Sequence, residues 1–72
     1  MSNYIKVSDN RIITKIDLLS IYKVEKDRYC QINYGIYFNY KEGKDDVQIY
    51  YYNENDRDNW FEYIEKELIL YD

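Results

Sequence analysis

The side chains that could carry chemistry in this chain are a lone cysteine and several carboxylates. The 72 residues include no histidine, which removes the usual general base and the commonest metal ligand. Cys30 therefore has no histidine partner, and its place in an alternating apolar pattern predicts a core residue rather than a nucleophile. No glycine-rich phosphate loop is present.

Carboxylates occur mainly in two places, a polar turn near residue 45 and the segment 54–67. Two neighbouring acids can act as general acid and base, and Glu42, Asp45 and Asp46 together offer oxygen ligands for Ca²⁺. Their spacing matches no calcium-binding loop, and adjacent acids in a polar turn are typically solvated. We therefore predict no catalytic residue, no metal site and no cofactor, and interpret the protein as a non-enzyme.

Charge is distributed unevenly along the chain. Residues 1–53 carry eight basic and seven acidic side chains, a net of +1, whereas residues 54–72 carry two basic and seven acidic, a net of −5. The overall charge of −4 argues against a general phosphate-binding surface. An acidic surface is expected from Glu54, Asp56, Asp58, Glu62 and Glu65. It could imitate nucleic-acid phosphates and block a basic site, or it could be an ordinary solvated helix face.

Length and cysteine content predict one domain, residues 1–72, in the cytoplasm. A single cysteine cannot form the internal disulfide that a small secreted domain usually needs. There is no run of about 18 apolar residues that would span a membrane, and the N-terminal residues lack a signal-peptide apolar region.

A period of two organises residues 29–40, where every even position is apolar or aromatic. This pattern predicts a strand over about 28–40 with one buried face, and Gly35 marks a bend or a division into two strands. A polar turn and a second alternating run predict a hairpin with a strand over about 46–52. If paired residue numbers sum to 87, Phe38 faces Ile49, and Tyr52 faces Gly35 and covers its bare backbone.

Two further hairpins are expected upstream. A strand over about 18–25 turns at residues 26–27 onto the long strand, with Ile21 opposite Ile32 and Leu19 opposite Tyr34 on the inner face. Strands over about 3–8 and 11–14 flank a polar turn, but their place in the sheet is left open.

The period changes near the C-terminus. Asn53 or Asn55 can cap a helix over about 55–69, and its apolar stripe consists of Trp60, Phe61, Ile64, Leu68 and Tyr71. The predicted fold class is α+β, an antiparallel β-meander of four to five strands packed against one C-terminal helix. The stripe is expected to cover the inner face of the sheet, formed by Leu19, Ile21, Ile32, Ile36, Phe38, Ile49 and Tyr51.

Tyrosine is the most unusual feature of the composition, with eleven residues. The registers gather five of them on the outer face without a basic residue: Tyr22, Tyr29, Tyr37, Tyr50 and Tyr52. Tyrosine is favoured at protein interfaces, which predicts a protein partner and a homo-oligomer. It also fits strands when half-exposed, and an AT-rich coding sequence would enrich it. Because a positive groove is missing, we expect no direct nucleic-acid binding.

The order of segments, from RIITKIDLLSIYKVE through paired strands to NENDRDNWFEYIEKEL, resembles small bacterial and phage proteins in which a pleckstrin-homology-like β-meander ends in one helix. A full domain of that family has seven strands, so this would be a reduced version, and it lacks a clear basic lipid-headgroup pocket. Size, acidity and composition also resemble phage accessory proteins, which include inhibitors of host defence. The resemblance implies an inhibitor or adaptor, in agreement with a non-catalytic protein-binding module that acts through its tyrosines. The alternatives are an acidic nucleic-acid mimic, based on the acidic residues of segment 54–72, and a module that binds a nucleotide or small molecule at a subunit seam.

Overall fold

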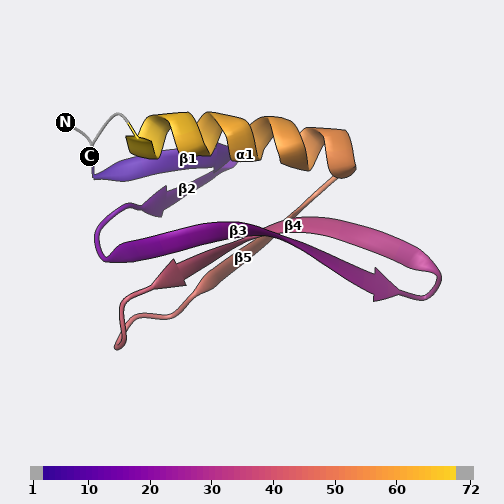
Figure 1. Ribbon diagram of the computed structural model, residues 1–72, viewed down its shortest axis with the longest axis horizontal. Coiled ribbons are helices and arrows are strands. Elements are labelled where there is room, and N and C mark those ends of the chain that lie inside the picture. The colour runs from indigo at the N-terminus through magenta and orange to yellow at the C-terminus, as the bar shows by residue number, and fades with distance from the viewer. Residues whose placement is uncertain (1–2, 70–72) are drawn as a thin grey trace.

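The computed structural model describes residues 3–69, which form strands β1 to β5 followed by one helix, α1 (Figure 1). The elements are β1 (Tyr4–Ser8), β2 (Arg11–Thr14), β3 (Leu18–Arg28), β4 (Gln31–Tyr40), β5 (Val47–Tyr51) and α1 (Glu54–Ile69). All paired strands are antiparallel, which confirms the predicted α+β class. The strands form two sheets, β1–β2 and β3–β4–β5. Tyr71 of the expected helix stripe lies outside the described residues.

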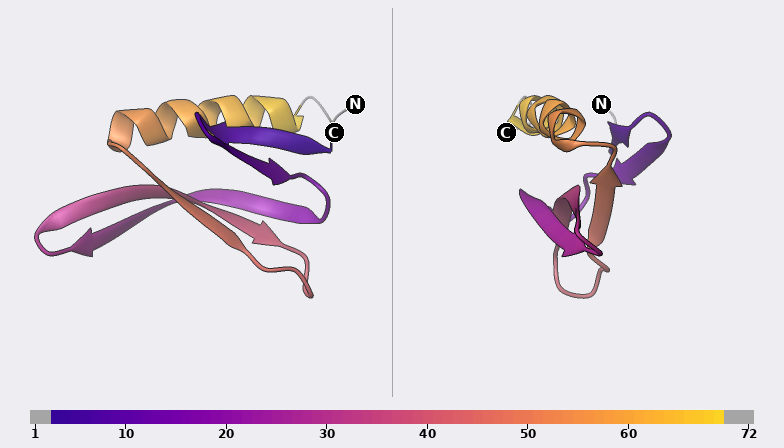
Figure 2. Two further views of the ribbon diagram at one scale, coloured as in Figure 1. Left: turned by 180° about the vertical axis from the view of Figure 1, so that it is seen from behind. Right: turned by 90° about the vertical axis from the view of Figure 1, so that its right-hand side faces the viewer.

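The core lies between the three-stranded sheet and a layer made of α1 and the β1–β2 hairpin. Figures 1 and 2 show α1 and β1 side by side, both on the same side of the larger sheet. Both layers contribute to the buried cluster, which consists of Ile5, Val7, Ile13, Ile36, Phe38, Tyr40, Ile49 and Ile64. The sequence did not predict where the N-terminal hairpin lies. In the structure, this hairpin and α1 together cover the inner face of the larger sheet.

β3 and β4 form a longer hairpin than the sequence predicts. The chain turns at residues 29–30, which both have positive φ values of 54° and 62°, the backbone form of two-residue hairpin turns that match the strand twist. The prediction of a turn at residues 26–27 was wrong. In that register Phe38 would have faced Lys15, whereas in the observed register it faces Ile21. Pairing of the apolar residues in the middle of β3 and β4 therefore stabilises the hairpin more than a turn at residues 26–27 would.

Three residues predicted to lie on the inner face are exposed. Cys30 lies in the exposed turn, and Ile32 lies near the same tip, where no other element covers the sheet. A bulge between Leu18 and Ser20 shifts the strand alternation by one residue, so Leu18 packs against the core and Leu19 faces solvent. The predicted burial of Cys30, Ile32 and Leu19 was therefore wrong.

β4 and β5 pair two residues away from the predicted register. Phe38 faces Val47 rather than Ile49, and a shift of two keeps every side chain on its predicted face. The Asp46 carboxylate accepts a hydrogen bond from the Tyr40 backbone N–H at 2.8 Å. The Asp46 side chain thus accepts the hydrogen bond of a backbone N–H that would have paired with β5 in the predicted register. The loop between the last paired residues of β4 and β5 is therefore longer than predicted.

Gly35 lies inside β4, which continues through it without a break. It faces Tyr50 rather than Tyr52, and the Tyr50 ring covers its backbone. A Cβ atom at Gly35 would lie 2.8 Å from the Ile49 carbonyl oxygen and 2.9 Å from Tyr50 Cδ1. The predicted covering of the glycine by an aromatic ring therefore occurs, with a different ring.

Two tyrosine hydroxyls join the small sheet to the large one. Tyr51 donates a hydrogen bond to the Val7 carbonyl oxygen at 2.5 Å, and Tyr40 donates to the Thr14 carbonyl oxygen at 2.6 Å. Burial raises the pKa of both phenols, so both stay protonated as donors at neutral pH. These two tyrosines thus have a structural role.

Asn53 caps α1. Its Oδ1 accepts a hydrogen bond from the Asp56 backbone N–H at 2.7 Å, and its carbonyl oxygen accepts one from the Arg57 N–H at 3.0 Å. Of the two predicted caps, Asn53 is confirmed over Asn55. The predicted stripe is confirmed as far as Leu68: Ile64 is fully buried, and Trp60, Phe61 and Leu68 pack against the core. Over residues 3–69, no helix is long and apolar enough to cross a membrane.

Candidate protein-binding face

The side of the three-stranded sheet opposite α1 presents a cluster of tyrosines. Strand alternation places Tyr22, Tyr37 and Tyr50 on this side, and Tyr22 lies directly opposite Tyr37 in the register. Tyr22 is 48% exposed and Tyr50 is 44% exposed, with the half-buried Tyr37 between them. We call these three residues the tyrosine face.

The three rings of the tyrosine face are held in place by their neighbours. Tyr22 and Tyr37 stack with ring centroids 5.1 Å apart and an interplanar angle of 15°. The Tyr37 hydroxyl donates a hydrogen bond to Asp46 at 2.6 Å, and Gln48 Nε2 donates one to the Tyr50 hydroxyl at 2.7 Å. The face is therefore ordered before any partner arrives, which lowers the entropy lost on binding.

Asp46 connects the tyrosine face to the stability of the β4–β5 hairpin. Donation from Tyr37 and from the Tyr40 backbone lowers the pKa of Asp46 below its ordinary 3.8, and the same hydrogen bond raises the pKa of Tyr37. Because the pKa is lowered in the folded state, this stabilisation is present above about pH 4 and is lost as the pH falls through the lowered pKa.

We expect the thermal midpoint of unfolding to decrease when the pH is lowered below about 4. The decrease should be smaller in Asp46→Asn, because that variant has no carboxylate to protonate at this position. Circular dichroism melts between pH 6 and pH 2 measure the difference, and Asp45→Asn serves as the matched control. Equal acid sensitivity of Asp46→Asn and the unmodified protein would contradict this assignment.

The other two predicted face residues lie elsewhere. Tyr29 is in the β3–β4 turn and is 93% exposed, and Tyr52 is in the linker before α1 and is 90% exposed. The longer β3 also places Lys26 and Arg28 on the side of the tyrosine face, where the sequence predicted no basic residue. The displaced turn is the cause, because it adds three residues to the strand.

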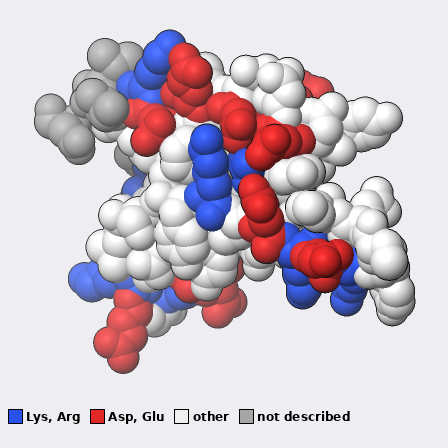
Figure 3. Space-filling view, turned by 45° about the vertical axis from the view of Figure 1, so that its right-hand side comes forward, with Lys and Arg blue, Asp and Glu red and all other residues white. Residues whose placement is uncertain are grey.

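Ion pairs occupy much of the predicted acidic surface. Figure 3 shows acidic side chains across this side of the molecule with basic side chains among them. Asp58 contacts Lys23 at 3.2 Å, and Glu62 contacts Lys66 at 3.1 Å. Glu54 lies 3.7 Å from Arg57, so only Asp56 and Glu65 have no cation within the described part of the chain. Paired acids are poorly suited to imitate a row of phosphates.

Arg57 is a structural residue that the sequence analysis missed. It is only 3% exposed, and its guanidinium lies 2.7 Å from Asp58 and 3.7 Å from both Glu25 and Glu54. It also donates a hydrogen bond to the Val24 carbonyl oxygen at 3.2 Å. The sequence did contain a signal for the burial of this residue. Position 57 lies three residues before Trp60 and so extends the apolar stripe at the same helical spacing. The Arg57 hydrogen bond is the leading cause that lowers the pKa of Asp58.

We expect Arg57→Ala to lower the free energy of unfolding by about 2 kcal/mol and Arg57→Met to change it by less than about 1 kcal/mol. The guanidinium lies 5.3 Å from the Tyr34 ring centroid, and its buried stem packs as an apolar group. Its carboxylate partners are largely exposed and can be solvated again. Urea denaturation measures both variants, and equal losses would show that charge, rather than packing, stabilises this site.

The carboxylates and the single cysteine are the remaining candidates for chemistry. Between residues 3 and 69, no three His, Cys, Asp or Glu side chains are arranged to hold a metal ion. Cys30 is a free, exposed thiol in a turn. Comparisons with protein families, curated proteins and solved structures found no match. The tyrosine face is therefore defined by this structure alone. It is the side of the three-stranded sheet that α1 does not cover.

Proposed function

We propose that this protein is a non-catalytic protein-binding module that binds its partner, in the first place a second copy of itself, on the tyrosine face. The observation that carries the proposal is the one-sided covering of the sheet. α1 and the β1–β2 hairpin pack on one side, and the other side presents Tyr22, Tyr37 and Tyr50. Tyrosine rings supply apolar contact area while their hydroxyls tolerate water, as transient interfaces require.

Charge at the two ends of the face favours a second copy as the occupant. Lys26 and Arg28 lie near the β3–β4 turn, and Asp45 and Asp46 lie in the loop at the opposite end (Figure 1). A two-fold axis that lies between the two faces and runs perpendicular to the strands would stack the faces with their strands in opposite directions. The basic end of each copy would then meet the acidic end of the other. Symmetric dimers use such self-complementary surfaces, and opposite charges orient the encounter.

The partner would be a host protein if the chain is a monomer. Small size and an acidic balance suit the inhibitor or adaptor role that the resemblance to phage accessory proteins implies. The acidic-mimic alternative has no support from the geometry, because ion pairs hold most of its carboxylates.

We expect a concentration-dependent rise in molar mass from 9.0 kDa towards twice that value, and we expect Tyr22→Ser plus Tyr50→Ser to abolish it. Loss of two ring surfaces removes the central contacts of the interface. Size-exclusion chromatography with light scattering over a concentration series measures the effect. The matched control, Tyr29→Ser plus Tyr52→Ser, removes two exposed tyrosines that lie off the face and should associate normally.

Charge reversal tests the orientation of the two copies. Lys26→Glu plus Arg28→Glu should weaken association at low salt, and adding Asp45→Lys should restore part of it. A monomer at every concentration, or equal association of the Tyr22 and Tyr50 double variant, would overturn self-association through this face.

A further inference from the structure

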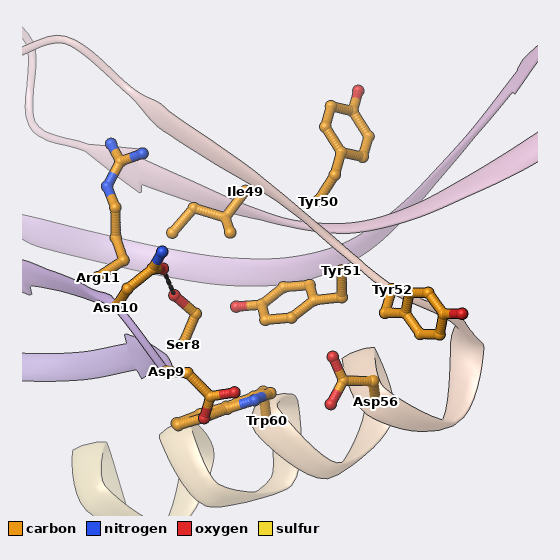
Figure 4. Close-up of a pocket in the computed structure, with 10 residues that line it drawn as sticks. All are labelled: Ser8, Asp9, Asn10, Arg11, Ile49, Tyr50, Tyr51, Tyr52, Asp56 and Trp60. Atoms are coloured by element: carbon orange, nitrogen blue, oxygen red, sulfur yellow. Dashed lines mark hydrogen bonds between the residues drawn. The ribbon is translucent and has the colours of Figure 1, made fainter.

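A cleft of about 340 Å³ lies on the helix side of the molecule, away from the tyrosine face. Three segments meet there: the turn between β1 and β2, the end of β5 with its linker, and the first two turns of α1 (Figure 4). Its volume falls within the range of small-ligand sites. Tyr50 contributes to the wall, but Figure 4 shows its ring directed away from α1, so the cleft and the tyrosine face use different side chains.

Two carboxylates without a cation lie on the helix side of this cleft. Asp9 comes from the β1–β2 turn and Asp56 from the first turn of α1. Neither has an ion-pair partner within residues 3–69, in contrast to Asp58, which lies two positions after Asp56 on the helix. Arg11 also lines the cleft, but Figure 4 shows that its side chain extends past Ile49, away from both acids. The three charged side chains leave a net charge of −1 in the cleft.

Aromatic rings complete the walls around the two carboxylates. Trp60, Tyr51 and Tyr52 line the cleft, and the Tyr52 ring is almost fully exposed. Trp60 also lines a second hollow of about 260 Å³ with Tyr63, whose ring packs edge-on at 5.6 Å. The indole is thus accessible from two hollows. A tryptophan ring face attracts cations more strongly than the face of any other aromatic side chain.

We propose that this cleft binds an arginine side chain presented by a protein partner. A guanidinium is planar, so it stacks on an aromatic ring while its N–H donors reach carboxylates on either side. Asp9 and Asp56 would supply the acceptors, and Trp60 would supply the ring. Arginine and tryptophan are the residues that most often dominate protein interfaces. This site is independent of the tyrosine face, and either proposal can fail alone.

The test uses a capped Gly-Arg-Gly peptide, with the neutral Gly-citrulline-Gly peptide as the matched ligand. Nuclear magnetic resonance titration follows the indole N–H of Trp60, the only tryptophan, and the backbone amides of Asp9 and Asp56. We expect saturable shifts with the arginine peptide and at least about tenfold weaker binding of the citrulline peptide. Asp9→Asn plus Asp56→Asn should weaken arginine binding by a similar factor, and Glu62→Gln plus Glu65→Gln should leave it unchanged.

Several outcomes would overturn the proposal. These are absence of shifts, equal binding of both peptides, unchanged binding in the Asp9 and Asp56 variant, and shifts confined to the tyrosine face. Tighter binding of a capped Gly-Glu-Gly peptide would assign the cleft to Arg11 and an anion instead. Tighter binding of a Gly-Lys-Gly peptide would exclude the preference for guanidinium. If the double variant does not fold, the comparison of arginine and citrulline peptides on the unmodified protein still decides.

Discussion

Replacement of Phe38 by alanine is expected to lower the free energy of unfolding by about 3–5 kcal/mol. Phe38 is fully buried in the central strand of the sheet, between Ile21 on β3 and Val47 on β5. Its ring packs with residues of the helix and of the N-terminal hairpin in one core cluster, so the cavity left behind would adjoin every layer of the fold. The close-packed surroundings can collapse only in part into such a cavity.

The size of the domain makes this loss decisive. A chain of 72 residues is expected to have a total stability of about 4–11 kcal/mol, so Phe38→Ala would remove much of it. Urea denaturation at a fixed protein concentration, which keeps any self-association constant, measures the change. Tyr52→Ala is the control, because its ring is exposed and its loss should cost less than about 0.5 kcal/mol. A loss below about 1 kcal/mol for Phe38→Ala would contradict the described core.

Gly35→Val is expected to be the second most damaging change, with a loss of about 3 kcal/mol. A Cβ atom at this position would come within 2.8 Å of the Ile49 carbonyl oxygen, a backbone atom of the paired strand. It would also come within 2.9 Å of the Tyr50 ring and 3.1 Å of Val24 Cγ2. Side chains could rotate away, but the carbonyl oxygen can move only if β4 and β5 separate.

A graded series distinguishes the two sources of the clash. Gly35→Ala should cost about 1–3 kcal/mol, less than Gly35→Val. Adding Tyr50→Ala should relieve only the contact with the ring and should not restore stability, because the carbonyl oxygen remains in place. Thermal melts by circular dichroism measure all three variants. Full rescue by Tyr50→Ala would show that the ring, rather than the backbone, excludes a side chain at Gly35.

The residues of the candidate sites were partly predictable. Tyr22, Tyr37 and Tyr50 were predicted on the outer face, and they lie there because a strand register shifted by two or six residues leaves the faces unchanged. Lys26 and Arg28 were not expected there, because the turn lies three residues further along the chain. The cleft beside Trp60 had no signal in the sequence, since residues 8–11 of the β1–β2 turn meet residues 49–60 only in the folded chain.

The sequence by itself determined the elements and their faces. Alternation over residues 29–40, the spacing of Trp60, Phe61 and Ile64, and the Asn53 cap are local patterns, and local patterns reflect backbone geometry that each segment has on its own. They identified five strands, one helix, their order and most of the inner and outer side chains.

Only the tertiary structure decided which residues meet. The β3–β4 turn lies where it brings Ile21 opposite Phe38, and that choice carries Cys30 to an exposed tip. Arg57 is buried because it lies on the side of α1 that packs on the sheet, where its guanidinium lies over the Tyr34 ring of β4 and beside Glu25 of β3. The β1–β2 hairpin is placed by the hydroxyls of Tyr40 and Tyr51. Each outcome depends on contacts between segments that are distant in the chain. The energies of these contacts add up over the whole core, so they cannot be predicted from any single segment of the sequence.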